Sequence, residues 1–242
     1  MNTKISDVKV IAFDADDTLW SNEPYFREAE HQFETLIAPF AIDTPIFDEL
    51  FTTEMTNMES LGYGAKAFTI SLVETAVRIS HGHVPNDVII KIMNVGKSLL
   101  KTPMSPLDGV VDTLTYLRSI DYKLVVATKG EQRDQRNKLR RSGLDSYFDF
   151  VDVMQDKSED EYRRLMQILG IRPEELVMVG NSFKSDIMPV LNLGGFGVHI
   201  PFEITWQHEQ AEVFDHPHLV ELTTFRELKN IFKSKKVNIP IK

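Results

Sequence analysis

The sequence contains no cysteine, and this absence excludes several kinds of chemistry at once. Disulfide bonds, thiolate nucleophiles and cysteine-ligated zinc sites all need a residue that the chain does not have. The sequence also has no apolar run of about 18 residues, the length that a membrane-spanning helix requires. It does not open with the basic and apolar segments of a signal peptide. We therefore expect a soluble, cytoplasmic protein without a membrane partner.

Positive charge is also scarce. The chain carries 27 lysine and arginine residues against 36 acidic residues, so its formal net charge is −9 and its pI about 5.3. Nucleic acids and anionic membranes attract basic surfaces, so we expect neither as a partner. With 242 residues and 42% hydrophobic content, the chain can form a core domain with a large insertion, or two modest domains. The composition does not indicate an oligomeric state.

Short apolar segments predict a parallel β-sheet. The first covers residues 8–13, which are rich in Val, Ile and Phe. More follow from residue 123 onward, and helical patterns over residues 109–120, 132–143, 159–169 and 184–193 lie between most of them. Strands that alternate with helices form parallel sheets with helices on both faces. The later strands are expected over residues 123–127, 150–154, 176–179, 197–200 and 219–222.

A long helical block lies between the first two predicted strands. Apolar residues recur there at spacings of three and four, as in Phe26, Ala29 and Phe33. Pro45 and Pro85 suit helix starts. We expect helices over residues 25–39, 45–61, 65–80 and 85–100. The chain would then divide into an α/β core, residues 1–20 and 104–242, and a helical insertion, residues 21–103.

Three acids follow the first apolar segment. Asp14, Asp16 and Asp17 stand at the carboxyl end of the predicted strand, where open α/β sheets bind their ligands. Like charges about 4 Å apart repel by roughly 4 kcal/mol at an effective dielectric near 20, so this grouping opposes folding. A divalent cation removes the repulsion, and oxygen ligands of this kind suit Mg²⁺. An acidic turn that caps the following helix is the alternative interpretation.

Polar residues also follow three later strands. Thr128 closes the second strand, where its hydroxyl either binds an anion or belongs to an ordinary turn. Lys157 precedes a predicted helix, and surface charge is its simplest interpretation. Asp186 enters a helix after the turn that begins Gly180-Asn181, where it either ligates a metal ion or interacts with the helix dipole.

Together and in this order, these segments resemble the four motifs of the haloacid dehalogenase-like (HAD) hydrolase superfamily. The resemblance covers essentially the whole chain. It implies a Rossmann-like parallel-sheet core with a helical-bundle cap inserted after the first strand. The family patterns are D-x-D-x-T/V-L/V, a Ser or Thr at a strand end, a Lys usually followed by Pro, and G-D-x-x-x-x-D. They match, in order, Asp14, Asp16, Thr18 and Leu19; Thr128; Lys157; and Gly180 with Asp186.

The resemblance implies a Mg²⁺-dependent phosphatase that hydrolyses a small phosphorylated metabolite through an aspartyl-phosphate. Asp14 would be the nucleophile, while Asp16 would protonate the leaving group and later activate water. The family's cation contacts the first carboxylate, the backbone carbonyl of the second acid and a motif-four acid. Those ligands correspond here to Asp14, Asp16 and Asp186, with Asn181 binding directly or through water. Thr128, Lys129, Lys157 and Asn181 would hold the phosphoryl oxygens.

The sequence departs from the family pattern at two positions. Asn181 stands where an acid is usual, so Mg²⁺ would meet less negative charge and bind more weakly. Ser158 replaces the usual proline, and we expect this change to have little effect on the site, because proline there would only stiffen a turn. Asp16 favours a phosphatase over a dehalogenase of the same superfamily, because a halide leaves without a proton. A phosphomutase and a non-catalytic binding protein that retains the fold remain open.

Two further segments are candidates for contacts with the rest of the substrate. Residues 62–68 join two predicted helices and contain two glycines and Lys66, which would reach the non-reacting end of the substrate. Similar caps present a substrate-specificity loop in this region, and a simple interhelical turn is the alternative. The aromatic residues within 201–209 either border the pocket or pack under the edge of the core.

Overall fold

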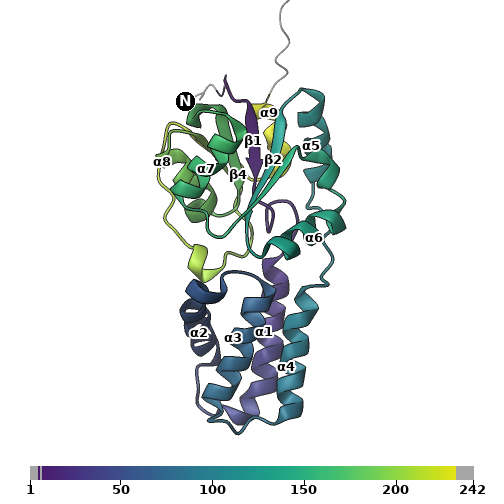
Figure 1. Cartoon of the computed structure of the whole chain (residues 1–242), viewed down its shortest axis with the longest axis vertical. Coiled ribbons are helices and arrows are strands. Elements are labelled where there is room, and N and C mark those ends of the chain that lie inside the picture. Colours follow the sequence, from purple (N-terminus) through teal and green to yellow (C-terminus); the bar gives the residue numbers. More distant parts are fainter. Residues whose placement is uncertain (1–4, 6, 233–242) are drawn as a thin grey trace, which may run out of the picture.

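The computed structural model describes residue 5 and residues 7–232. Figure 1 shows a twisted sheet flanked by helices at one end of the molecule and a bundle of four long helices at the other. The chain enters the bundle after the first strand and returns to the sheet before the second. The two parts meet at the lower edge of the sheet in this view.

The core is a six-stranded parallel sheet with the order β3-β2-β1-β4-β5-β6. Strand β1 (Val10–Phe13) lies in its interior between β2 (Lys123–Lys129) and β4 (Leu176–Gly180). Because every pair is parallel, all strands end at the same edge of the sheet. The remaining strands are β3 (Phe150–Met154), β5 (Phe196–His199) and β6 (Leu219–Glu221).

Side chains of β1 alternate between two hydrophobic clusters, one on each face of the sheet. Ile11 and Phe13 pack in the cluster that contains Leu114, whereas Val10 and Ala12 pack in the cluster that contains Tyr162. Burial on both faces explains why the strand is apolar throughout. The helices of the core are α5 (Val110–Ser119), α6 (Gln132–Ser142), α7 (Glu159–Leu169), α8 (Met188–Asn192) and α9 (Leu228–Ile231).

The helical bundle has a hydrophobic core of its own. Phe33, Leu50, Leu72 and Ile92 are buried together, one from each long helix. The two connections between bundle and sheet run side by side, since the Leu107 backbone N–H donates to the Leu19 carbonyl over 2.9 Å. The division at residues 20/21 and 103/104 stays a prediction, and its outer ends, residues 1–4, 6 and 233–242, lie outside the described residues. The bundle helices are α1 (Glu23–Ile37), α2 (Ile46–Leu61), α3 (Ala65–Ile79) and α4 (Asn86–Leu99).

The expected elements agree with the structure except after β4. The sequence predicts one helix over residues 184–193, but the chain forms a turn of π-helix, η4 (Phe183–Ile187), followed by α8. The Ser182 hydroxyl accepts the Ser185 N–H, and the Asp186 carboxylate accepts the Ser182 N–H, so side chains replace regular helical bonds here. Short 3₁₀ turns lie at Ala38–Phe40, Asp145–Tyr147, Pro173–Glu175, Gln207–Glu209 (η5) and Phe225–Glu227.

The helices of the described residues are not of the kind that crosses a bilayer, since none is both long enough and apolar enough.

Candidate active site

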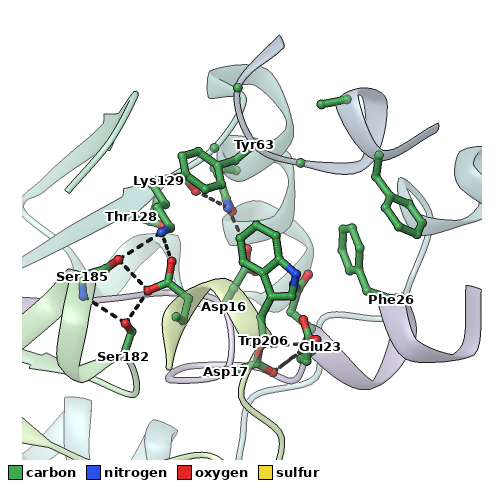
Figure 2. A pocket seen from close by; sticks show the side chains of 18 of the residues that line it. Asp16, Asp17, Glu23, Phe26, Tyr63, Thr128, Lys129, Ser182, Ser185 and Trp206 are labelled. Carbon is green, nitrogen blue, oxygen red and sulfur yellow. Dashed lines mark hydrogen bonds and ion pairs between the residues drawn. The ribbon is translucent and has the colours of Figure 1, made fainter. Parts of the chain in front are cut away.

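A cavity of about 190 Å³ lies at the carboxyl edge of the sheet, where the core meets the bundle. Figure 2 shows Asp16 and Thr128 from the core and Tyr63 and Phe26 from the bundle around it. The cavity is also lined by Asp14, Lys129, Lys157, Asn181 and Asp186, which the sequence selects as site residues. Parallel strands explain this meeting, because β1, β2, β3 and β4 each deliver the residues that follow them to one edge.

The loop after β1 turns its three acids in different directions. Asp17 has a left-handed backbone, with φ of 63°. Its carboxylate accepts the N–H groups of Asn22, over 2.7 Å, and Glu23, over 3.0 Å, at the start of α1. Asp17 therefore caps a helix, as the alternative interpretation of the acidic turn expects. All three acids line the cavity, but Asp14 and Asp16 make no part of this cap.

Lys157 lies between the carboxylates of Asp14 and Asp186. Its Nζ atom contacts Asp14 Oδ1 and stands 2.5 Å from Asp186 Oδ1. All three residues are buried, and burial raises the pKa of both carboxyl groups. Burial opposes the charge of Lys157, but the two carboxylates outweigh it and raise its pKa. Lys157 is thus a buried group that favours its charged form, and surface charge is the wrong interpretation of it.

Asp16 is held by three groups that sequence reasoning missed. Lys138 Nζ lies 3.0 Å from both of its carboxylate oxygens, Gln135 Nε2 donates over 2.8 Å, and Trp20 Nε1 donates over 2.7 Å. Burial alone would raise the pKa of Asp16, but Lys138 and these donors lower it. Gln135 and Lys138 are spaced three apart on α6, which places them on one helix face. That spacing was the available signal, but α6 is so rich in charge that it did not stand out.

Asn181 faces the same group of oxygen atoms as the acids. Its amide nitrogen lies 3.2 Å from the Asp16 backbone carbonyl oxygen, 3.3 Å from Asp14 Oδ2 and 3.2 Å from Thr18 Oγ1. The first two atoms only accept hydrogen bonds, so the amide presents its nitrogen to them. Asn181 therefore offers a hydrogen-bond donor to these acceptors, at the position where the family motif usually carries an acid. Its roles as a metal ligand and a phosphate ligand stay predictions.

Lys129 contacts a segment that comes late in the chain. Its ammonium group contacts Glu209, lies 3.1 Å from Ser185 Oγ and stands 4.3 Å from the centre of the Tyr63 ring. Glu209 also accepts hydrogen bonds of 2.5 Å from Ser182 and Ser185. Burial would raise the pKa of Glu209, but Lys129 and the hydroxyls lower it to about 2.

The contact between Lys129 and Glu209 anchors residues 201–209 beside the cavity, where Trp206 and Glu209 line it (Figure 2). Of the aromatic residues in this segment, Trp206 borders the pocket.

The glycine-rich loop between α2 and α3 reaches the cavity, but Lys66 points away from it. Gly62, Tyr63 and Gly64 line the cavity, with φ of 68° at Gly62 and 108° at Gly64. Lys66 instead forms a 3.0 Å ion pair with Glu131 of the core, and 57% of its side chain is exposed. It bridges the bundle and the sheet in this structure, and its contact with substrate stays a prediction.

The donor set of the site fits a hard divalent cation. It offers the carboxylates of Asp14 and Asp186 and the backbone carbonyl of Asp16, all oxygen atoms of the kind that Mg²⁺ prefers. Two buried carboxyl groups share the charge of Lys157, and burial raises the pKa of both. A further cation would stabilise their ionised forms. Among the described residues, no group of three or more His, Cys, Asp or Glu side chains converges as a metal site. Weaker Mg²⁺ binding because of Asn181 stays a prediction.

Comparisons with known proteins agree with this geometry. The family model for haloacid dehalogenase-like hydrolases matches residues 8–194. A glyceraldehyde 3-phosphate phosphatase of Methanothermobacter thermautotrophicus is 24% identical, over 82% of this chain and 88% of its own length. The N-acylneuraminate-9-phosphatase of Mus musculus is 32% identical over 36% of this chain and 37% of its own. The crystal structure of a haloacid dehalogenase-like family hydrolase from Xanthomonas campestris superposes with a TM-score of 0.82 at 32% identity, covering 90% of this chain and 87% of that one.

Proposed function

Because the chain belongs to the haloacid dehalogenase-like hydrolase family, we propose that it is a Mg²⁺-dependent phosphatase acting on a small phosphorylated metabolite. The placement of Lys157 between Asp14 and Asp186 supports this proposal most directly. A buried ammonium group beside a carboxylate nucleophile provides positive charge where a phosphoryl group must approach. The phosphatase relatives described above support the same class of reaction.

The proposed reaction has two steps, and both use Asp14 and Asp16. In the first, an Asp14 carboxylate oxygen forms a bond to phosphorus while the bond from phosphorus to the leaving oxygen breaks. The electron pair goes to that oxygen, and Asp16 in its protonated form, which the second step regenerates, donates a proton to it. In the second, Asp16 accepts a proton from water as the water oxygen attacks phosphorus. The bond between phosphorus and the Asp14 oxygen breaks, its electron pair returns to the Asp14 carboxylate, and inorganic phosphate is released.

The remaining residues hold the phosphoryl group and the metal ion. Lys157 and the Thr128 hydroxyl would contact phosphoryl oxygens, while Asp14, Asp186 and the Asp16 carbonyl would hold Mg²⁺. When bound, the cation lessens the repulsion between the Asp14 carboxylate and an anionic phosphate. Asp16 also supports a phosphatase over a dehalogenase, since a proton donor serves an oxygen leaving group and a halide does not need one.

Hydrolysis of p-nitrophenyl phosphate, with EDTA and with added Mg²⁺, tests the proposal. We expect EDTA to abolish turnover and Mg²⁺ to restore it. Asp14→Asn, which is nearly isosteric, should remove turnover and leave the fold intact by circular dichroism. Asp16→Asn should lose about 10²–10⁴-fold in kcat on an alkyl phosphate and less on the activated aryl ester. Full activity of Asp14→Asn would reject the mechanism, and an inactive wild-type protein that still binds phosphate would favour a binding role.

A further inference from the structure

The cavity contains acceptor atoms that the protein itself leaves without hydrogen bonds. Five buried side-chain polar atoms in the described residues have no hydrogen-bond partner, and three of them belong to residues that line this cavity. These three are the Oε1 atoms of Glu23, Glu54 and Gln135. The Glu23 atom has an ion pair with Arg27 Nε, over 3.3 Å, but no hydrogen bond. Gln135 is 6% exposed and Glu23 is 8% exposed, so neither can turn freely to bulk water. Buried polar atoms are normally paired, and such a concentration therefore points to a ligand that donates hydrogen bonds.

The same wall of the cavity carries an excess of carboxylates. Glu23, Glu30 and Glu54 all line it, and Arg27 pairs with the first two, over 3.3 Å and 3.1 Å. Burial and the neighbouring carboxylates raise the pKa of Glu54 to about 8, while burial also raises the pKa of Glu23 to about 8. Three carboxyl groups therefore lie near a single arginine, and Glu54 has no ion pair with it. A ligand with positive charge or with several donors would relieve this imbalance, whereas an anionic one would increase it.

Aromatic side chains also line the cavity. The ring centres of Phe26 and Phe68 in the bundle are 5.1 Å apart. The ring centres of Tyr63 and Trp206 are 6.2 Å apart, and Figure 2 shows both side chains. All four line the cavity. Aromatic faces pack against the carbon skeleton of a small ligand and attract ammonium groups. These contacts suit the same ligand as the carboxylates do.

We propose that this wall selects phosphate monoesters whose leaving group carries hydrogen-bond donors, best an ammonium group, and rejects leaving groups with a second anionic group. The inference rests on the proposed function, because it places the phosphoryl group beside Asp14 and the leaving group toward Glu23 and Glu54. A substrate that enters displaces water from these acceptors, so it must supply donors of its own. A carboxylate at the same place leaves the acceptors unpaired and adds a negative charge beside carboxyl groups whose own ionisation burial already opposes.

Calorimetric binding to the Asp14→Asn variant tests the inference without turnover. Two matched series serve as ligands, each with an ammonium, a hydroxyl and a carboxylate member. The first is 2-aminoethyl, 2-hydroxyethyl and carboxymethyl phosphate; the second is glucosamine 6-phosphate, glucose 6-phosphate and 6-phosphogluconate. In at least one series we expect the ammonium member to bind roughly tenfold or more tighter than the carboxylate member, the effect of about one charge-assisted hydrogen bond. The hydroxyl member should lie between them.

Glu54→Gln in the same background removes the charge and keeps the size of the side chain. This variant should reduce the ratio of the binding affinities of the ammonium and carboxylate members several-fold. The matched control is Glu59→Gln, an exposed position on the same helix α2, which should leave the ratio unchanged. Equal binding within both series, tighter binding of the carboxylate members, or a ratio that Glu54→Gln does not move would overturn the inference. The aryl phosphate assay of the wild-type protein reports on the proposed function separately, so the two failures are distinguishable.

Discussion

The carboxylate of Asp186 lies directly against Gly180. A Cβ atom at Gly180 would stand 2.2 Å from Asp186 Oδ2 and 2.4 Å from its Cγ atom. Real Cβ atoms do not approach other atoms so closely, so any side chain at residue 180 displaces Asp186. The two ends of the fourth motif are therefore linked by packing, and the glycine is needed to bring the carboxylate to Lys157.

Gly180→Ala should accordingly impair the site through Asp186. We expect kcat to fall about 10²-fold, the usual effect of a misplacement of about 1 Å, and the Mg²⁺ requirement to rise. Mg²⁺ titrations of activity measure both. A double-mutant cycle with Asp186→Ala provides the control, because the alanine at residue 180 should cause little further loss once the carboxylate is gone. Additive losses would show that Gly180 acts on something other than Asp186.

Asn181→Asp should make the protein more dependent on Mg²⁺ for its stability. The new carboxylate would face Asp14 Oδ2 and the Asp16 carbonyl oxygen, which lie 3.3 Å and 3.2 Å from the present amide nitrogen. Repulsion should lower the melting temperature in EDTA, and the added charge should tighten Mg²⁺ binding roughly tenfold. Thermal unfolding across a Mg²⁺ series measures both effects. A Mg²⁺-induced rise equal to that of the wild-type protein would place the ion away from Asn181.

Lys138→Met should disturb the orientation of Asp16, because it removes the ammonium group and keeps most of the unbranched side chain. Lys138 binds both oxygens of Asp16 and also donates to Asn22 Oδ1, over 2.8 Å, where the chain enters the bundle. We expect kcat on an alkyl phosphate to fall about 10- to 100-fold, and kcat on an aryl phosphate to fall less, because its leaving group needs little protonation.

The control for this prediction is Arg140→Met, an exposed arginine on α6 whose side-chain partners lie on the same helix. Lys138→Arg should recover part of the activity by restoring the charge. Equal losses on the alkyl and the aryl ester would show that Lys138 supports the fold or general phosphate binding.

Glu54 should make the protein less stable as the pH rises toward 8. Its pKa is raised from 4.5 to about 8 in the folded protein, so between these values the folded state keeps a proton that the unfolded chain releases. The free energy of unfolding therefore falls as the pH rises through this window. Glu54→Gln removes the titrating group and should reduce the fall by an amount on the order of 1–3 kcal/mol, since each pKa unit corresponds to about 1.4 kcal/mol.

Urea unfolding of Glu54→Gln and the wild-type protein at about pH 5.5 and about pH 8 measures this difference. Glu59→Gln on the same helix should behave as the wild-type protein does. A slope with pH that Glu54→Gln leaves unaltered would show that the Glu54 carboxyl group titrates normally in the folded state.

The sequence by itself determined the fold and the catalytic end of the site. Buried strands such as β1 are apolar throughout and amphipathic helices repeat at three and four residues, so local pattern predicts both. Parallel strands then bring Asp14, Thr128 and Asn181 together, because residues that follow strands must meet at one edge. Thr128, Lys157 and Asp186 needed the family motifs as well, since each has an ordinary structural interpretation by itself.

The tertiary structure alone decided which side chains support these residues and what the rest of the cavity is made of. Lys138 lies 122 residues from Asp16 in the sequence, and Glu209 lies 80 residues from Lys129, so no local pattern pairs them. Lys66 is a further case, because the packing of bundle against core pairs it with Glu131, while its contact with substrate stays a prediction. From the sequence pattern alone, the acidic residues of α1 and α2 belong to the polar faces of ordinary amphipathic helices. Only the packing of the bundle against the sheet buries Glu23 and Glu54 around one cavity, because burial depends on what lies opposite a helix face and not on the helix itself.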